Sequence, residues 1–474
     1  MPEATVNRFP EPAASFSDRH IGPSSVEQLA MLKTLECDSL SELIEEVVPD
    51  GLLLNDPLEI PEALTERSAL ERLRETMAKN RVKTSFIGSG YANTFSPPVV
   101  QRCVLENPGW YTAYTPYQAE ISQGRLEALL NFQTLICELT AMPVANASLL
   151  DEATAAAEAV SLAAATKPKG RVFFVSDRCY PQTIDVLRTR AEPLDYELIV
   201  SDPSEFDFDA HEGEVLGMLL QVPDEYGALD LRTHLVTKCH VAGGLVVFAA
   251  DLLSLCLLTP PGEVGADLVV GSAQRFGVPL GFGGPHAAYM ACSDALKRRL
   301  PGRLVGVSKD EDGRPALRLS LQTREQHIRR EKATSNICTA QVLLAVMAGF
   351  YGVFHGPEGL RSIAERIHAV TSCLANSLQN AGFRLRNATW FDTLTVEVSE
   401  SQKKEIQKRG SDIGIDLRED LEGALGITLD EVVVADGTWK KVLMAFSDVV
   451  EAEDWEAGIP ATMRRDSSFL EQPV

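Results

Sequence analysis

Two short apolar runs decide the fold: LVVFAAD at residues 245–251 and DLVVGSAQR at residues 267–275. Each run is apolar on both faces of an extended chain, which is typical of strands buried inside a parallel sheet. Four similar runs lie at residues 171–176, 194–200, 217–222 and 287–291. Helical patterns alternate with them at residues 126–139, 152–165 and 182–190. This alternation predicts βαβ units and a large α/β domain with a mostly parallel sheet.

The pattern changes after about residue 305. Helices predicted at residues 337–354 and 358–381 precede an alternating strand at residues 393–398. A further helix, the apolar run 432–434 and a strand at residues 442–446 follow. Such a mixture predicts a smaller C-terminal α+β domain. We therefore expect three parts: an N-terminal extension with helices over residues 1–80, a large domain over 81–305 and a small domain over 306–474.

The N-terminal extension carries two helix-start signals. Ser24 with Glu27, and Ser39 with Glu42, have the spacing of a capping box, in which the serine hydroxyl and the acid side chain bond each other's backbone N–H. A third helix is predicted at residues 63–79. The extension is therefore expected to be largely helical.

Composition excludes several classes of protein. The 474 residues carry 44 basic and 67 acidic side chains, a net charge of −23, so a nucleic-acid partner is not expected. The nine cysteines contain no C-x-x-C pair, which indicates reduced thiols and no zinc site. The most apolar stretch, residues 243–258, is too short to span a bilayer and contains Asp251, so no membrane partner is expected. We expect a cytoplasmic protein.

Asp251 ends the first run at the sheet edge where open α/β sheets bind ligands. Taken alone, it could equally be a helix cap or a loop acid. Its spacing to the second strand end, residues 272–275, favours a site. In pyridoxal-phosphate enzymes of the aspartate-aminotransferase fold, an Asp at one strand end pairs with the pyridinium nitrogen, and a Lys after the next strand forms the Schiff base. The motif GFGGPH follows at residues 281–286.

Two further segments stand out. Residues 107–124 form a loop rich in aromatic and hydroxyl-bearing side chains and interrupted by proline and glycine. It is either the wall of a site, an interface or a structural turn. Residues 322–332 gather arginines, a lysine and a histidine in an otherwise acidic chain. They form either a solvated helical face or an arm that meets an anion.

Four runs, at residues 111–132, 146–159, 265–286 and 315–340, closely resemble the amino-terminal half of glycine decarboxylase, the P-protein of the glycine cleavage system. The resemblance extends from DRHIGP at residues 18–23 to about Arg465. One departure is Ala92, where the family usually has a second aromatic residue after Tyr91. We expect only a local change from it.

The resemblance implies a fold-type-I pyridoxal-phosphate-dependent transferase fold in each of two homologous halves, with the Schiff-base lysine only in the carboxy-terminal half. The lysine position falls on Arg275 in this chain. A guanidinium keeps its proton at any working pH, so it cannot be the amine nucleophile. Arg275 and Asp251 are thus expected to be vestigial. The chain should hold no cofactor covalently, and pyridoxal phosphate should be held by the partner half.

The resemblance also implies a function. This chain would be the non-lysine-bearing subunit of glycine decarboxylase, which decarboxylates glycine and transfers the aminomethyl group to lipoyl on the H-protein. Its partners would be glycine, the H-protein and the carboxy-terminal-half subunit, whose active site it would complete. The residues expected to reach that site are Tyr114, Tyr117, Glu120, Gln123, Thr334, Ser335 and Asn336.

Residues 146–154 lie where the fold holds the cofactor phosphate at a helix N-terminus. Asp151 and Glu152 would repel a phosphate dianion there, which indicates a vestigial pocket. Two alternatives stay open. One is a self-sufficient pyridoxal-phosphate enzyme that uses another lysine. The other is a standalone pseudoenzyme with a regulatory or binding role.

Overall fold

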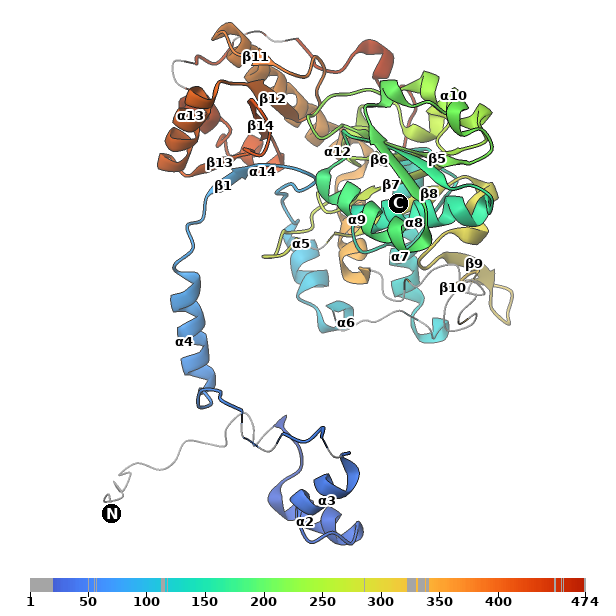
Figure 1. Cartoon of the computed structure of the whole chain (residues 1–474), viewed down its shortest axis with the longest axis vertical. Helices are drawn as coiled ribbons and strands as arrows, with labels where there is room; N and C mark the ends of the chain where they lie inside the picture. The colour runs from blue at the N-terminus through green and yellow to red at the C-terminus, as the bar shows by residue number, and fades with distance from the viewer. Residues whose placement is uncertain are drawn as a thin grey trace. The chain divides into compact units, whose positions relative to one another are not determined.

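The computed structural model describes residues 20–49, 51–54, 56, 58–111, 116, 118–284, 286–321, 330, 337, 341–446, 449–452, 454 and 456–472. The chain divides into two compact units, residues 1–82 and 83–474 (Figure 1). In the described part of the chain, no helix is both long enough and apolar enough to cross a membrane. The predicted boundary at residue 305 stays a prediction.

The first unit contains helices α2 (Ser25–Thr34), α3 (Leu40–Val47) and α4 (Glu66–Met77). The capping box at Ser24 is confirmed, because its hydroxyl accepts from the Glu27 N–H and the Glu27 carboxylate accepts from the Ser24 N–H. The second box is only half formed. Ser39 caps Glu42, but the Glu42 carboxylate accepts from the N–H of Asp38 instead.

The second unit is built around a seven-stranded sheet with the order β2-β8-β7-β6-β5-β3-β4. Its strands are β2 (Val144–Ala145), β3 (Val172–Ser176), β4 (Glu197–Ser201), β5 (Val215–Val222), β6 (Leu245–Ala250), β7 (Leu268–Ser272) and β8 (Ala288–Cys292). The five strands from β7 to β4 are parallel. At one end of the sheet β8 pairs antiparallel with β7, and β2 pairs antiparallel with β8. The predicted mostly parallel sheet is confirmed, and all six apolar runs contain strands.

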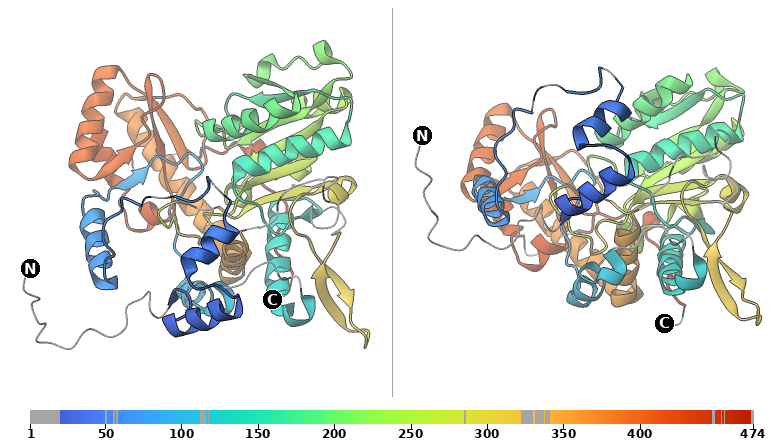
Figure 2. Two further views of the ribbon diagram at one scale, coloured as in Figure 1. Left: turned by 60° about the horizontal axis from the view of Figure 1, so that its bottom comes forward. Right: turned by 90° about the horizontal axis from the view of Figure 1, so that it is seen from below.

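Helices cover both faces of this sheet (Figures 1 and 2). Val247 and Ala249 face a core shared with α8 (Glu152–Thr166) and α9 (Pro181–Ala191). The alternate residues Val246 and Phe248 face the core formed with α7 (Gln123–Thr140), α10 (Thr233–Val241) and α12 (Val342–Asn380). Because both faces are packed, every residue of β6 is apolar and buried.

The C-terminal part combines short strands with helices. A three-stranded antiparallel sheet joins β11 (Arg384–Leu385), β12 (Thr393–Glu397) and β14 (Ala424–Thr428), and β1 (Thr84–Phe86) pairs with β13 (Ile415–Leu417). Helix α13 (Glu400–Asp412) begins in a capping box at Ser399. The predicted break between residues 354 and 358 is confirmed, since α12 is interrupted at Gly356, whose φ of +63° favours glycine.

One prediction for this part is wrong. The strand predicted at residues 442–446 is helix α15 (Lys440–Phe446), and the run 432–434 lies in helix α14 (Glu431–Ala435). The apolar residues of α15 bury one helical face, with Val442, Ala445 and Phe446 inside and Met444 exposed. The hairpin of β9 (Val305–Lys309) and β10 (Pro315–Leu319), drawn in yellow in Figure 2, was not predicted.

Arg465 anchors the C-terminal segment to the end of α7 and to the loop after β6. Its buried guanidinium donates to the backbone oxygens of Glu138 at 2.9 Å and Leu139 at 2.8 Å, in the last turn of α7, and of Leu255 at 2.9 Å. The last four carbonyls of a helix have no partner within the helix, so this cation satisfies two of them. The contact explains why one arginine near the end of the chain is buried.

We expect Arg465→Met to lower the free energy of unfolding by about 2–4 kcal/mol, because three buried carbonyls lose their donor. Urea unfolding followed by circular dichroism measures this change. The matched control is Arg464→Met, at an exposed neighbouring arginine, which should change stability by less than about 0.5 kcal/mol. Equal effects of the two substitutions would contradict the anchoring role.

Candidate functional site

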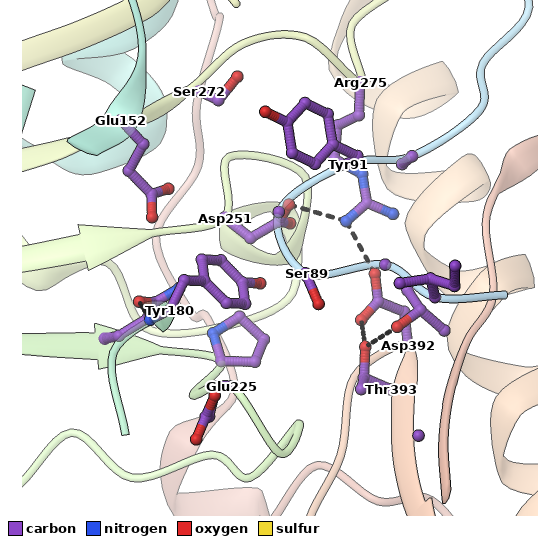
Figure 3. Close-up of a pocket in the computed structure, with 18 of the residues that line it drawn as sticks. Ser89, Tyr91, Glu152, Tyr180, Glu225, Asp251, Ser272, Arg275, Asp392 and Thr393 are labelled. Carbon is purple, nitrogen blue, oxygen red and sulfur yellow. Dashed lines mark hydrogen bonds and ion pairs between the residues drawn. The ribbon is translucent and has the colours of Figure 1, made fainter. Parts of the chain in front are cut away.

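A pocket opens where the parallel strands end (Figure 3). Pro223–Glu225 follow β5, Asp251 follows β6, and Gln274 and Arg275 lie just after β7. The loop after β1 and the strands β12 and β14 close the pocket from the other side. The described lining residues include Ser89, Tyr91, Glu152, Tyr180, Gln221, Ser272, Asp392, Thr393, Arg418 and Thr428.

Arg275 lies between two carboxylates in this pocket. Its Nη1 atom is 2.7 Å from Oδ2 of Asp251 and 2.8 Å from Oδ2 of Asp392 (Figure 3). The side chains of Arg275 and Asp392 are only 9% and 7% exposed. Burial alone would lower the pKa of Arg275, but the two carboxylates outweigh it and raise that pKa above its ordinary value. The guanidinium therefore stays charged.

Asp251 uses both carboxylate oxygens within the protein. Oδ2 accepts from Arg275, and Oδ1 accepts from the backbone N–H of Ser254 at 2.7 Å. The predicted position of Asp251 at the strand end, beside the end of the next strand, is confirmed. The alternative interpretation of Asp251 as a loop acid also holds, because the bond to Ser254 organises the turn after β6. The Arg275 cation thus lies against the carboxylate that a cofactor ring nitrogen would use.

Helix α8 begins beside the same pocket with two acids. Asp151 caps the helix by accepting from the N–H of Thr154 at 2.7 Å. Glu152 points its carboxyl group into the pocket, and Oε1 is buried with no hydrogen-bond partner among the described residues. Burial, Asp251 and Asp151 raise the pKa of Glu152 to about 8. At this helix N-terminus the Asp151 carboxylate already occupies an N–H group that a bound phosphate would use.

The residues present do not fit covalently held pyridoxal phosphate. None of the described pocket residues is a lysine, and Arg275 stands at the predicted lysine position. The side chain that would meet the cofactor ring is bound to Arg275, and acids stand where the phosphate would lie. The described residues also contain no group of three or more His, Cys, Asp or Glu side chains that could hold a metal ion.

None of the other predicted site residues that the structure describes lines this pocket. Tyr114, Tyr117, Thr334, Ser335 and Asn336 lie outside the described residues. Glu120 is exposed in a 3-10 turn, Ala119–Ile121. The side-chain amide of Gln123 accepts from the N–H of Leu317 at 2.8 Å and donates to its carbonyl at 2.9 Å, so it is bound to strand β10.

Several pocket residues were missed. Asp392 precedes the predicted strand at residues 393–398, and that position was its only signal. The buried pair of Glu225 and Arg418, with 3.1 Å between carboxylate and guanidinium, joins residues 193 positions apart. Tyr180 lines the pocket from the start of α9. No local pattern marks these residues, because only the fold brings them together.

The raised pKa of Glu152 predicts a pH-dependent stability. In the unfolded chain this carboxyl titrates near 4.5, whereas in the folded chain it titrates near 8, so folding is progressively weakened as the pH rises through this window. Glu152→Gln removes the effect, and it should stabilise the protein by roughly 1–3 kcal/mol near pH 8.5 and by little near pH 4.5. Urea unfolding at both pH values measures the difference. A stabilisation that does not change with pH would contradict this account.

Comparison with known proteins places the chain in a family. Residues 18–446 match the family model described as glycine cleavage system P-protein. A glycine dehydrogenase (decarboxylating) of Nitrobacter winogradskyi is 54% identical over 470 residues, which are 98% of this chain and 49% of the relative. A protein of the same name from Nostoc punctiforme is 51% identical, over 100% of this chain and 49% of its own length. The chain thus spans about half the length of these relatives.

Solved structures agree. A crystal structure of glycine decarboxylase (P-protein) of the glycine cleavage system, in inhibitor-bound form, is similar with a TM-score of 0.80 and 35% identity, over 90% of this chain and 99% of that chain. Alanine–glyoxylate aminotransferase from Nostoc sp., at 18% identity and a TM-score of 0.54 over 84% of this chain and 97% of that one, shares the fold alone. The predicted fold-type-I transferase fold is confirmed.

The family model, the relatives and the solved glycine decarboxylase agree on one assignment. This chain belongs to the glycine cleavage system P-protein family.

Proposed function

We propose that this chain is the non-lysine-bearing subunit of glycine decarboxylase and that it completes the active site of a carboxy-terminal-half partner. The single observation that carries the proposal is the buried guanidinium of Arg275, bound by Asp251 and Asp392 at the position where a Schiff base would need an amine. Half-length coverage of the relatives supports a missing second half.

In this proposal the assembled enzyme decarboxylates glycine and passes the aminomethyl group to lipoyl on the H-protein. Pyridoxal phosphate belongs to the partner half and supplies the electron sink there. This chain contributes binding groups: the loop residues Tyr114, Tyr117, Glu120 and Gln123, and Thr334, Ser335 and Asn336 after the basic segment. A cytoplasmic location is part of the same proposal.

The direct test is reconstitution. The purified chain is mixed with the separately expressed carboxy-terminal half of the Nitrobacter winogradskyi relative, lipoyl H-protein and pyridoxal phosphate, and the exchange of labelled bicarbonate into glycine is measured. We expect exchange only when both halves are present, because neither half alone holds both walls of the site. No exchange at any ratio of the halves would instead support the standalone pseudoenzyme.

We expect Arg275→Lys alone to form no internal aldimine. An ammonium placed between Asp251 and Asp392 is stabilised in its charged form, and a charged amine is not a nucleophile. After incubation with pyridoxal phosphate and dialysis, the variant should show no absorbance band at about 420 nm, the region of a protonated imine. Retained far-ultraviolet circular dichroism controls for folding. A band that persists through dialysis would contradict this prediction, and in the unaltered chain it would contradict the proposed function.

A further inference from the structure

The glycine-rich motif after β7 contains a fully exposed aromatic side chain. Phe282 is 99% exposed, and its φ is +62°, a left-handed conformation that costs free energy for any residue with a Cβ atom. Gly281 and Gly284 on either side also have positive φ values. An isolated chain gains nothing from holding a phenyl ring in water on a strained backbone. The strained backbone and the exposed ring of Phe282 together indicate that another molecule covers this side chain.

His286, at the end of the same motif, is buried rather than exposed, and its polar atoms lack partners within the residues that the structure describes. Its side chain is only 6% exposed, and neither ring nitrogen has a hydrogen-bond partner among the described residues. Burial lowers its pKa, so the ring is neutral and carries one donor and one acceptor, both unmet. Its only aromatic neighbour in the described part of the chain is Tyr91, at 4.6 Å between ring centroids. Buried polar atoms normally find partners, so this ring is also incomplete.

Tyr91 links the motif to the pocket. Its ring lies in front of Arg275 in Figure 3 and lines the pocket, while it also packs against His286. A Cβ atom at Gly284 would lie 2.9 Å from the Tyr91 ring, so the loop approaches this ring as closely as glycine allows. The exposed ring of Phe282 therefore lies beside the pocket, on a loop that packs over Tyr91 and the buried imidazole of His286. We call residues 281–284 with Tyr91 the Phe282 surface.

We infer that the Phe282 surface is the contact site for the carboxy-terminal half of the enzyme, with Phe282 buried in that partner. The inference rests on the proposed function. Relatives carry about as much chain again as this one, which provides the occupant. A second copy of this chain is disfavoured, because two bodies of net charge −23 repel each other. Aromatic side chains at the centre of contacts commonly provide much of the binding energy.

Phe282→Gly tests the inference sharply. In the isolated chain glycine relieves the left-handed strain and removes no packing, so the melting temperature should stay equal or rise. Binding to the carboxy-terminal half, measured by isothermal titration calorimetry, should weaken at least tenfold. The matched control is Val241→Ser, which removes an apolar side chain that is 83% exposed at the C-terminal end of α10, before β6 and so at the opposite sheet edge. It should change the dissociation constant by less than twofold.

His286→Leu is the second variant. Since the isolated chain leaves both ring nitrogens unmet, an apolar side chain should not lower its melting temperature. Because both nitrogens are buried beneath the surface, binding to the carboxy-terminal half should change by less than twofold. Unweakened binding by Phe282→Gly would overturn the inference and leave the proposed function standing. No binding or exchange by the unaltered chain would overturn both. Self-association of the chain in sedimentation that Phe282→Gly abolishes would reassign the surface to a second copy.

Discussion

The guanidinium of Arg275, shared between Asp251 and Asp392, links the end of the parallel sheet to the start of β12, the central strand of the three-stranded sheet. One cation with two carboxylates is stable in a buried place only if the remaining oxygens are also bonded, and here Ser254 and Thr393 donate to them. Loss of one member of such a group commonly costs about 3–5 kcal/mol, because it leaves a buried charge uncompensated. The protein's own charges thus occupy the region that a cofactor ring uses in related folds.

Other hydrogen bonds also join the large sheet to the C-terminal part of the chain. Arg418 donates to the backbone oxygen of Glu225 at 2.8 Å, and the hydroxyl of Thr395 donates to the backbone oxygen of Tyr226 at 2.9 Å. They hold the turn after β5 against β12 and β14. The pocket is therefore fixed from both sides, which suits a rigid wall better than a site that must open and close around a substrate.

The fold could be predicted where burial of an element gives its own residues a recognisable apolar pattern. Strands packed on both faces are apolar throughout, so the six runs located the large sheet. Predictions were wrong or missing where the apolar pattern was short or interrupted. The run at 442–446 is short enough to suit either a strand or a helix. Strand β14 was missed because Gly426, which packs against the Arg418 side chain, interrupts its apolar pattern.

The site was predictable only in part. Asp251 and Arg275 follow neighbouring strands, so their meeting could be expected from topology. Asp392 reaches Arg275 across 117 residues, and nothing in its surroundings along the chain indicates that contact. The predicted roles of Glu120 and Gln123 rested on composition and family resemblance. The structure shows Gln123 bound to β10, and its role toward a partner site stays a prediction.

That bond has a consequence for solubility. In β10, alternate residues turn their backbone groups to the free edge, and Leu317 is one of them, as are Pro315 and Leu319. Proline offers no N–H for a foreign strand, and the amide of Gln123 already occupies both groups of Leu317. An unprotected hairpin of this kind invites strand addition and aggregation. Gln123 closes the central position of the β10 edge, and Gln133 bonds the N–H and carbonyl of Val305 on the β9 edge in the same way, so both edges of the hairpin are partly protected against strand addition.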